Sequence, residues 1–109
     1  MAAPSLSTQQ QQAALRLGAD GRHAEVLTLL ADWSADVEKS PQLSLAYGTA
    51  YARLGRNAEG LRWVEHALSV ARSAGDSAIE RRALNARGAI ALVQGRPEEG
   101  ADFFTQGLI

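Results

Sequence analysis

The chain has 109 residues, which is room for one domain with a modest core. Charged residues of both signs make up 21% of it, and the formal net charge of −1 comes without a basic block, which excludes a nucleic-acid binder and a membrane-surface binder. Since the chain contains no cysteine, disulfides, thiolate metal sites and cysteine nucleophiles are excluded as well.

The N-terminal stretch MAAPSLSTQQQQ has neither a basic start nor an apolar segment, so it is not a secretory signal. No apolar run approaches the ~18 residues of a membrane span, and we expect a cytoplasmic protein. Residues 1–6 are expected to be a disordered N-terminus because they are proline, serine and small residues. The glutamine tract at 9–12 is expected at the start of a helix.

Helical periodicity begins in the first third of the chain. Apolar residues keep helical step between residues 24 and 37, which predicts one helix there. The residues in step are Val26, Leu29, Leu30, Trp33 and Val37. A further helix is predicted over 43–54, with Ser40 as its N-cap, Pro41 at its first position and Gly55 at its end.

The second half of the chain shows the same alternation of apolar stripes and glycine stops. One helix covers 58–72, and the next begins at a capping box of Ser77 and Glu80 and ends at Gly95. Pro97 opens the last helix. No strand is expected, because alternation is absent and β-branched residues are sparse. The chain therefore reads as about six helices, which short turns make antiparallel neighbours.

The sequence repeats itself. Residues 50–68, AYARLGRNAEGLRWVEHAL, return at 89–108 as AIALVQGRPEEGADFFTQGL when Gly55 is set over Gly95. The coinciding pairs are Arg56 and Arg96, Glu59 and Glu99, Gly60 and Gly100, Trp63 and Phe103, Val64 and Phe104, and Leu68 and Leu108. With Gly21 included, the turn glycines are spaced by 34 and then 40 residues. Thirty-four residues is the period of the tetratricopeptide repeat, a helical solenoid.

The chain resembles the tetratricopeptide repeat family over residues 7–109. The family pattern W-x2-L-G-x2-Y is matched by Ser44, Tyr47, Gly48 and Tyr51, and the third repeat keeps Gly88. The resemblance implies an all-α fold, a right-handed α-solenoid of three antiparallel helical hairpins. It implies a single domain whose repeats are 7–40, 41–80 and 81–109. The later repeats are lengthened and resemble those of bacterial signalling proteins.

Two glycines lie in the middle of predicted helices. Gly48 and Gly88 each cost about 1 kcal/mol relative to alanine at such a position. We expect the close approach of a neighbouring helix to offset this cost. Gly48 should then face the helix predicted over 58–72.

Residues suited to catalysis are few, and we predict a protein that is not an enzyme and uses no cofactor or metal. Neither His23 nor His66 has a carboxylate and a hydroxyl grouped with it; packing is expected for His23 and a solvated surface for His66. Glu98 and Glu99 are adjacent, so they do not face each other on a helix. The segment GRPEEG lacks the lysine of a phosphate loop.

Aromatic residues could line a ligand box. Trp63, Phe103 and Phe104 are the candidates, but their helical spacing and their place in the repeat favour packing between helices.

The resemblance also implies a binding surface, because the first helix of each tetratricopeptide repeat lines a concave groove. Transferred residue by residue, the groove consists of Gln11, Leu15, Leu45, Thr49, Ala52, Arg53, Arg82, Asn85, Ala89 and Leu92. Arg53, Arg82 and Asn85 would be its polar anchors, since arginine suits a carboxylate through bidentate bonds. The clamp of chaperone-binding members is not expected, because Gln11 and Thr49 stand where much of it would be.

The predicted function is a non-catalytic protein–protein interaction module that binds a peptide or helix of a partner in this groove. Two alternatives stay open. One is the N-terminal regulatory part of a longer bacterial signalling protein or transcription regulator. The other is self-association, with a homodimer formed through the C-terminal helix. Because no polar capping helix follows, we expect Phe103, Phe104, Leu108 and Ile109 to make that contact between chains.

Overall fold

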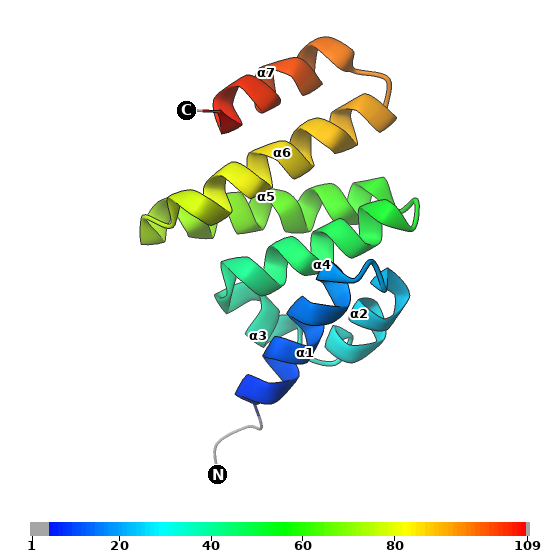
Figure 1. Ribbon diagram of the computed structural model, residues 1–109, viewed down its shortest axis with the longest axis vertical. Coiled ribbons are helices and arrows are strands. Elements are labelled where there is room, and N and C mark those ends of the chain that lie inside the picture. The colour runs from blue at the N-terminus through cyan, green and yellow to red at the C-terminus, as the bar shows by residue number, and fades with distance from the viewer. Residues whose placement is uncertain (1–4, 109) are drawn as a thin grey trace.

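The computed structural model describes residues 5–108, which form a stack of helices and no strand (Figure 1). The stack is elongated, with principal extents of 49 × 29 × 21 Å. The seven helices of the described residues are α1 (Thr8–Ala19), α2 (His23–Leu30), α3 (Ser34–Lys39), α4 (Pro41–Arg53), α5 (Asn57–Ala74), α6 (Ser77–Val93) and α7 (Pro97–Gly107). The expected all-α arrangement of antiparallel helical hairpins is therefore confirmed.

The prediction of one helix over 24–37 was wrong, and the count of six helices with it. The backbone leaves the helix after Leu30, and Trp33, at φ −122° and ψ 30°, precedes α3. At the break the Trp33 N–H donates to the Leu30 carbonyl, 3.0 Å away, and no side-chain hydrogen bond caps α3. Periodicity did not detect it, since apolar residues keep the same spacing on both sides.

Glycine turns join the helices as expected. Gly21, Gly55, Gly75 and Gly95 all have positive φ, between 70° and 87°, a conformation that glycine adopts without strain. Each hairpin therefore closes through a left-handed glycine residue.

The helix starts agree with the sequence at one place and differ at another. Ser40 caps α4 by accepting a hydrogen bond from the Leu43 N–H, as expected. The cap of α6 is Asp76, whose carboxylate accepts from the Ile79 N–H. The capping box predicted at Ser77 is wrong by one residue, because Ser77 already has helical backbone geometry.

The predicted contact at Gly48 is confirmed. A Cβ atom built there would lie 2.9 Å from the carbonyl oxygen of Gly60 on α5. The pair repeats between α6 and α7, where a Cβ atom on Gly88 would lie 3.0 Å from the carbonyl oxygen of Gly100. The backbones of α4 and α5, and those of α6 and α7, thus touch at glycine pairs, which explains the mid-helix glycines.

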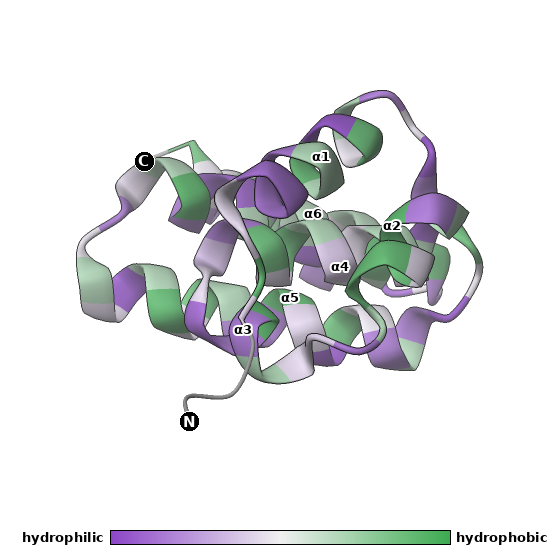
Figure 2. Ribbon diagram, turned by 90° about the horizontal axis from the view of Figure 1, so that it is seen from below, coloured by the Kyte–Doolittle hydropathy of each residue, from purple (hydrophilic) through white to green (hydrophobic). Residues whose placement is uncertain are grey.

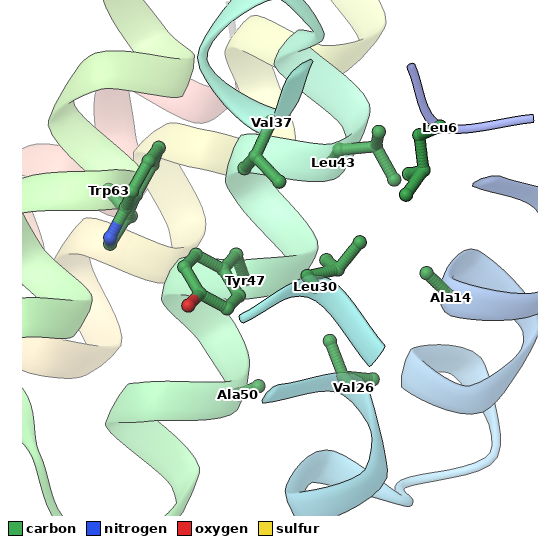
Figure 3. Close-up of a cluster of buried hydrophobic side chains, with 9 residues drawn as sticks. All are labelled: Leu6, Ala14, Val26, Leu30, Val37, Leu43, Tyr47, Ala50 and Trp63. Carbon is green, nitrogen blue, oxygen red and sulfur yellow. The ribbon is translucent and has the colours of Figure 1, made fainter. Parts of the chain in front are cut away.

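The core has two parts. One lies among α1–α4 and reaches α5 at Trp63, as Figure 3 shows, and the other lies among α4, α5 and α6. Seen from the α1 end in Figure 2, hydrophobic and hydrophilic residues alternate along the helices, as expected for helices with one buried face.

The N-terminal boundary needs a correction. Residues 1–6 were expected to be disordered, but Leu6 is only 4% exposed and packs in the first core cluster. Its N–H donates to the carboxylate of Asp36 on α3. Periodicity could not reveal this contact because the partners lie 30 residues apart. Residues 1–4 lie outside the described residues.

Candidate functional site

The first helices of the three hairpins, α1, α4 and α6, share one side of the stack. α4 contacts both α1 and α6. Their common face is hollowed at two places that meet at Thr49. We call the two hollows together the groove.

One hollow lies between α4 and α6 and has a volume of about 250 Å³. Its floor and walls are mainly alanine and aliphatic side chains. The lining residues are Thr49, Ala52, Arg53, Asn57, Asn85, Ala86, Ala89, Ile90 and Val93. Val93 is 72% exposed, so this hollow carries an apolar edge that water reaches.

The other hollow lies among α1, α4 and the start of α2, with a volume of about 310 Å³. Arg82 of α6 closes it on one side. The lining residues are Leu15, Gly18, Ala19, His23, Gln42, Leu45, Ala46, Thr49 and Arg82.

Most residues that the sequence assigned to the groove line these hollows. They are Leu15, Leu45, Thr49, Ala52, Arg53, Arg82, Asn85 and Ala89. Leu45 is 4% exposed, so it forms the floor and not the rim.

Two residues assigned to the groove lie elsewhere. The side-chain amide of Gln11 donates to the carbonyl of Leu6, 3.1 Å away, and holds the N-terminal segment. Leu92 packs toward α7, where its Cδ2 atom would lie 3.1 Å from a Cβ atom on Gly100. Gln11 contacts the N-terminal segment and Leu92 contacts α7. The assignment from the sequence considered only the first helix of each repeat, so it did not include these contacts.

The groove also contains residues that the sequence analysis did not assign to it. Ala46 and Ala86 follow predicted groove residues directly, so a wider helix face would have included them. Asn57 and His23 come from the first turns of α5 and α2, the second helices of their hairpins. His23 is half-buried, and its expected packing role is combined with a place on the groove wall.

The formally charged side chains that line the groove, Arg53 and Arg82, are both basic. No aspartate or glutamate is among the residues that line its two hollows. Arg53 and Arg82 are both exposed, and within residues 5–108 neither forms an ion pair. Other arginines are paired: Arg56 with Glu59, for example, at 2.6 Å. The two groove arginines are thus free to meet charges from outside.

His66 is less exposed to solvent than the sequence analysis predicted. His66 is half-buried, and its Nε2 lies 2.7 Å from the carbonyl oxygen of Glu38 at the end of α3. It also packs edge-on to Trp63, with ring centroids 6.1 Å apart. The expected solvated position was wrong because α3 folds back onto α5, which follows from the break after α2.

Tyr47 has a strongly shifted pKa. Burial, together with the neighbouring Tyr51 hydroxyl 3.3 Å away, raises the pKa of Tyr47 to about 12. The ring packs edge-on against Trp63, with centroids 5.1 Å apart. Tyr47 therefore belongs to the core as a neutral phenol.

The two adjacent glutamates of α7 have different surroundings. Glu99 lies between Arg87 and Arg96, at 3.8 and 3.5 Å, whereas Glu98 is exposed. Across residues 5–108, no group of three or more histidine, aspartate or glutamate side chains is placed to hold a metal ion.

The aromatic residues pack between helices. Trp63 is 7% exposed in the first core cluster. The ring of Phe103 lies beneath the guanidinium of Arg87, 4.5 Å from its carbon to the ring centroid. The ring of Phe104 would touch a Cβ atom on Gly88.

The four residues expected to associate two chains are thus in different environments. Phe103 and Phe104 are half-buried against α6 and do not form an open ledge. Leu108, in contrast, is 87% exposed. Ile109 lies outside the described residues.

A search of the described residues for membrane spans finds no helix that is both long and apolar enough to cross a bilayer.

Comparison with known proteins adds one finding. The family model of the tetratricopeptide repeat matches residues 41–108, which is more than half of the chain. The curated proteins and the solved structures contain no match. The matched segment covers α4, α5, α6 and α7, and it includes both glycine pairs, each of which lies between the two helices of one hairpin. The chain belongs to the tetratricopeptide repeat family.

Proposed function

We propose that the groove binds a segment of a partner protein, either a peptide or a helix. Tetratricopeptide repeats generally mediate protein–protein interactions and are generally not catalytic. The observation that carries the proposal is the continuity of the two hollows, which meet at Thr49 along α1, α4 and α6.

The side chains of the groove suit such a ligand. Alanines at 46, 52, 86 and 89 leave room above the helix backbones, so apolar side chains of a partner can enter. Polar groups stand beside them, among them Asn57 and Asn85. A mainly apolar floor with a few polar groups is the usual composition of a recognition site, because burial supplies affinity and hydrogen bonds supply orientation.

A steric block tests the proposal. Ala89 is exposed and lines the hollow between α4 and α6, so Ala89→Trp should fill that hollow without disturbing the core. Peptides selected from a displayed random library against the wild-type chain should lose at least about tenfold in affinity for this variant, since a ~1.4 kcal/mol penalty suffices. Isothermal titration calorimetry measures the change.

The matched control is Ala58→Trp. Ala58 is also an exposed helical alanine, but it lies on α5 and lines neither hollow. It should leave the affinity of the selected peptides unchanged. Equal losses for the two tryptophan variants, or no loss for either, would rule out the groove as the binding surface.

Self-association through α7 is a second candidate function. Leu108 occupies the repeat position of Leu68, yet Leu108 is 87% exposed and Leu68 only 8%. Glu98 and Asp102 are exposed toward the start of α7, and Arg81 borders its other end in a hollow shared with Gln106. An antiparallel pair of α7 helices from two copies would cover Leu108 and bring these opposite charges together.

A further inference from the structure

The groove differs from the rest of the surface in its charge. The chain as a whole carries 12 acidic and 11 basic residues, a nearly even balance. The groove nevertheless has two arginines and no acidic lining residue. An uncompensated positive field in a hollow attracts negative ligands, and its low-dielectric walls strengthen the attraction.

Several glutamates of the neighbouring helices are already paired with other arginines. Glu59 is held by Arg56, Glu65 by Arg87 and Glu80 by Arg72. Arg53 and Arg82 have no such partner among the described residues. Their guanidinium groups can each receive a carboxylate through two parallel hydrogen bonds.

The two arginines stand at different places along the groove. Arg82 lies beside Leu45 in one hollow, and Arg53 lines the other. Positions 45 and 53 are eight residues apart on α4, so the two sites are separated by roughly 12 Å along the helix axis at 1.5 Å per residue. Between them lies the mainly apolar floor around Thr49 and Ala86.

We propose that the groove recognises an acidic segment of a protein, in which two carboxylate side chains about 12 Å apart flank apolar residues. One carboxylate meets Arg82 and the other Arg53, while the apolar residues fill the hollows between them. Residues seven apart lie on the same face of a helix at about 10.5 Å, and the length of the glutamate side chains covers the difference. The inference rests on the proposed function, because it specifies the chemistry of the ligand of the same groove.

Three labelled peptides test the charge of the ligand. They share one alanine- and leucine-based helical sequence and differ only at two positions seven residues apart, which are both glutamate, both glutamine or both lysine. Fluorescence anisotropy should show that the glutamate peptide binds roughly tenfold more tightly than the glutamine peptide, and that the lysine peptide binds weakest. The advantage of glutamate should shrink as salt is raised above about 0.1 M, since screening weakens exposed pairs.

Charge reversal in the protein completes the test. The double variant Arg53→Glu with Arg82→Glu should invert the preference, so that the lysine peptide becomes the tightest ligand. The control Arg62→Glu with Arg81→Glu changes the net charge equally at exposed positions outside the groove, and it should keep the preference for glutamate.

The results separate this inference from the proposed function. Equal affinity for the glutamate and glutamine peptides, or the same loss in the control as in the groove variant, would overturn the acidic ligand. The acidic ligand would also be overturned if the selected library peptides lose affinity for Ala89→Trp but carry no acidic residues. Those results leave groove binding in place, whereas a library without any groove-dependent peptide removes the proposed function itself.

Discussion

At the scale of single residues, long-range partners decide what each side chain does. Arg87 is the clearest case: its side chain is 20% exposed, pairs with Glu65 on α5 and Glu99 on α7, and covers the Phe103 ring. An arginine of α6 thereby holds three helices together. Tyr47 has a comparable role in the first core cluster, where its phenol is buried beside Trp63.

The pKa of Tyr47 leads to a prediction about pH. In the unfolded chain a tyrosine loses its proton near pH 10, whereas the folded chain keeps the Tyr47 proton until about 12. The unfolded state therefore binds fewer protons between these values, so stability falls as pH rises from 10 and levels off above 12. Below pH 10 the contribution is fully present.

The measurement compares urea unfolding midpoints at about pH 9 and about pH 11.5. The decrease between the two pH values should be smaller in Tyr47→Phe than in the wild-type chain, because phenylalanine has no proton to lose. The Tyr51→Phe variant is the control for the neighbouring hydroxyl. An equal decrease in the wild-type chain and in Tyr47→Phe would contradict the buried neutral phenol.

At the scale of helices, close backbone contact sets the geometry of the second and third hairpins. Gly48 and Gly60 bring α4 and α5 together, and Gly88 and Gly100 do the same for α6 and α7. The arrangement fixes which face of α4 and α6 is left for the groove. A glycine is required where the neighbouring atoms are backbone, since backbone cannot move aside as a flexible side chain can.

Two alanine substitutions test this requirement. In Gly48→Ala the new Cβ atom meets the Gly60 carbonyl oxygen at 2.9 Å, so we expect a loss of about 1–3 kcal/mol in unfolding free energy. In Gly18→Ala the nearest atoms lie 3.9 Å away, an ordinary contact. That helix should therefore gain about 0.5–1 kcal/mol from the better helix former. Chemical denaturation gives both values, and Gly48→Ala at wild-type stability would refute the close contact.

At the scale of the whole molecule, α1 and α7 lie at opposite ends of the stack (Figure 1). α1 at one end exposes polar side chains, among them Gln9, Gln12 and Arg16. α7 at the other end exposes Glu98, Asp102 and Gln106, and Leu108, directly after it, is 87% exposed. A polar helix face suits water, whereas an apolar one suits a protein contact. Both end helices thus expose polar side chains, and the strongly exposed apolar side chain beside α7 is Leu108.

The exposed Leu108 side chain predicts a dimer that depends on this residue. Light scattering at micromolar concentration should give twice the monomer mass for the wild-type chain and the monomer mass for Leu108→Glu, since a buried unpaired carboxylate opposes the contact. Leu54→Glu is the control, because Leu54 is an apolar residue that is 48% exposed at the C-terminal cap of α4, away from α7 in the chain. Phe104 is unsuited to the test, since it packs on Gly88. A monomeric wild-type chain would exclude self-association through α7.

The sequence by itself determined the features that depend on neighbours along the chain. Apolar residues in helical step predicted α4, α5 and α6, glycines predicted the turns, and the repeat predicted the contact at Gly48 and the family. Local geometry is enough for these, because the helical period and the left-handed turn are properties of a few consecutive residues. The repeat then allowed groove residues to be assigned at equivalent positions of successive hairpins.

Only the tertiary structure decided where segments distant in sequence meet. It placed Leu6 against α3, turned α3 onto His66, and took Gln11 out of the groove. Periodicity is silent on these contacts, because the break after Leu30 leaves the apolar spacing intact while changing the direction of the chain. The tertiary structure also leaves Arg53 and Arg82 without acidic partners in residues 5–108. Which charges are neutralised depends on distances across helices, and those distances exist only once the stack has formed.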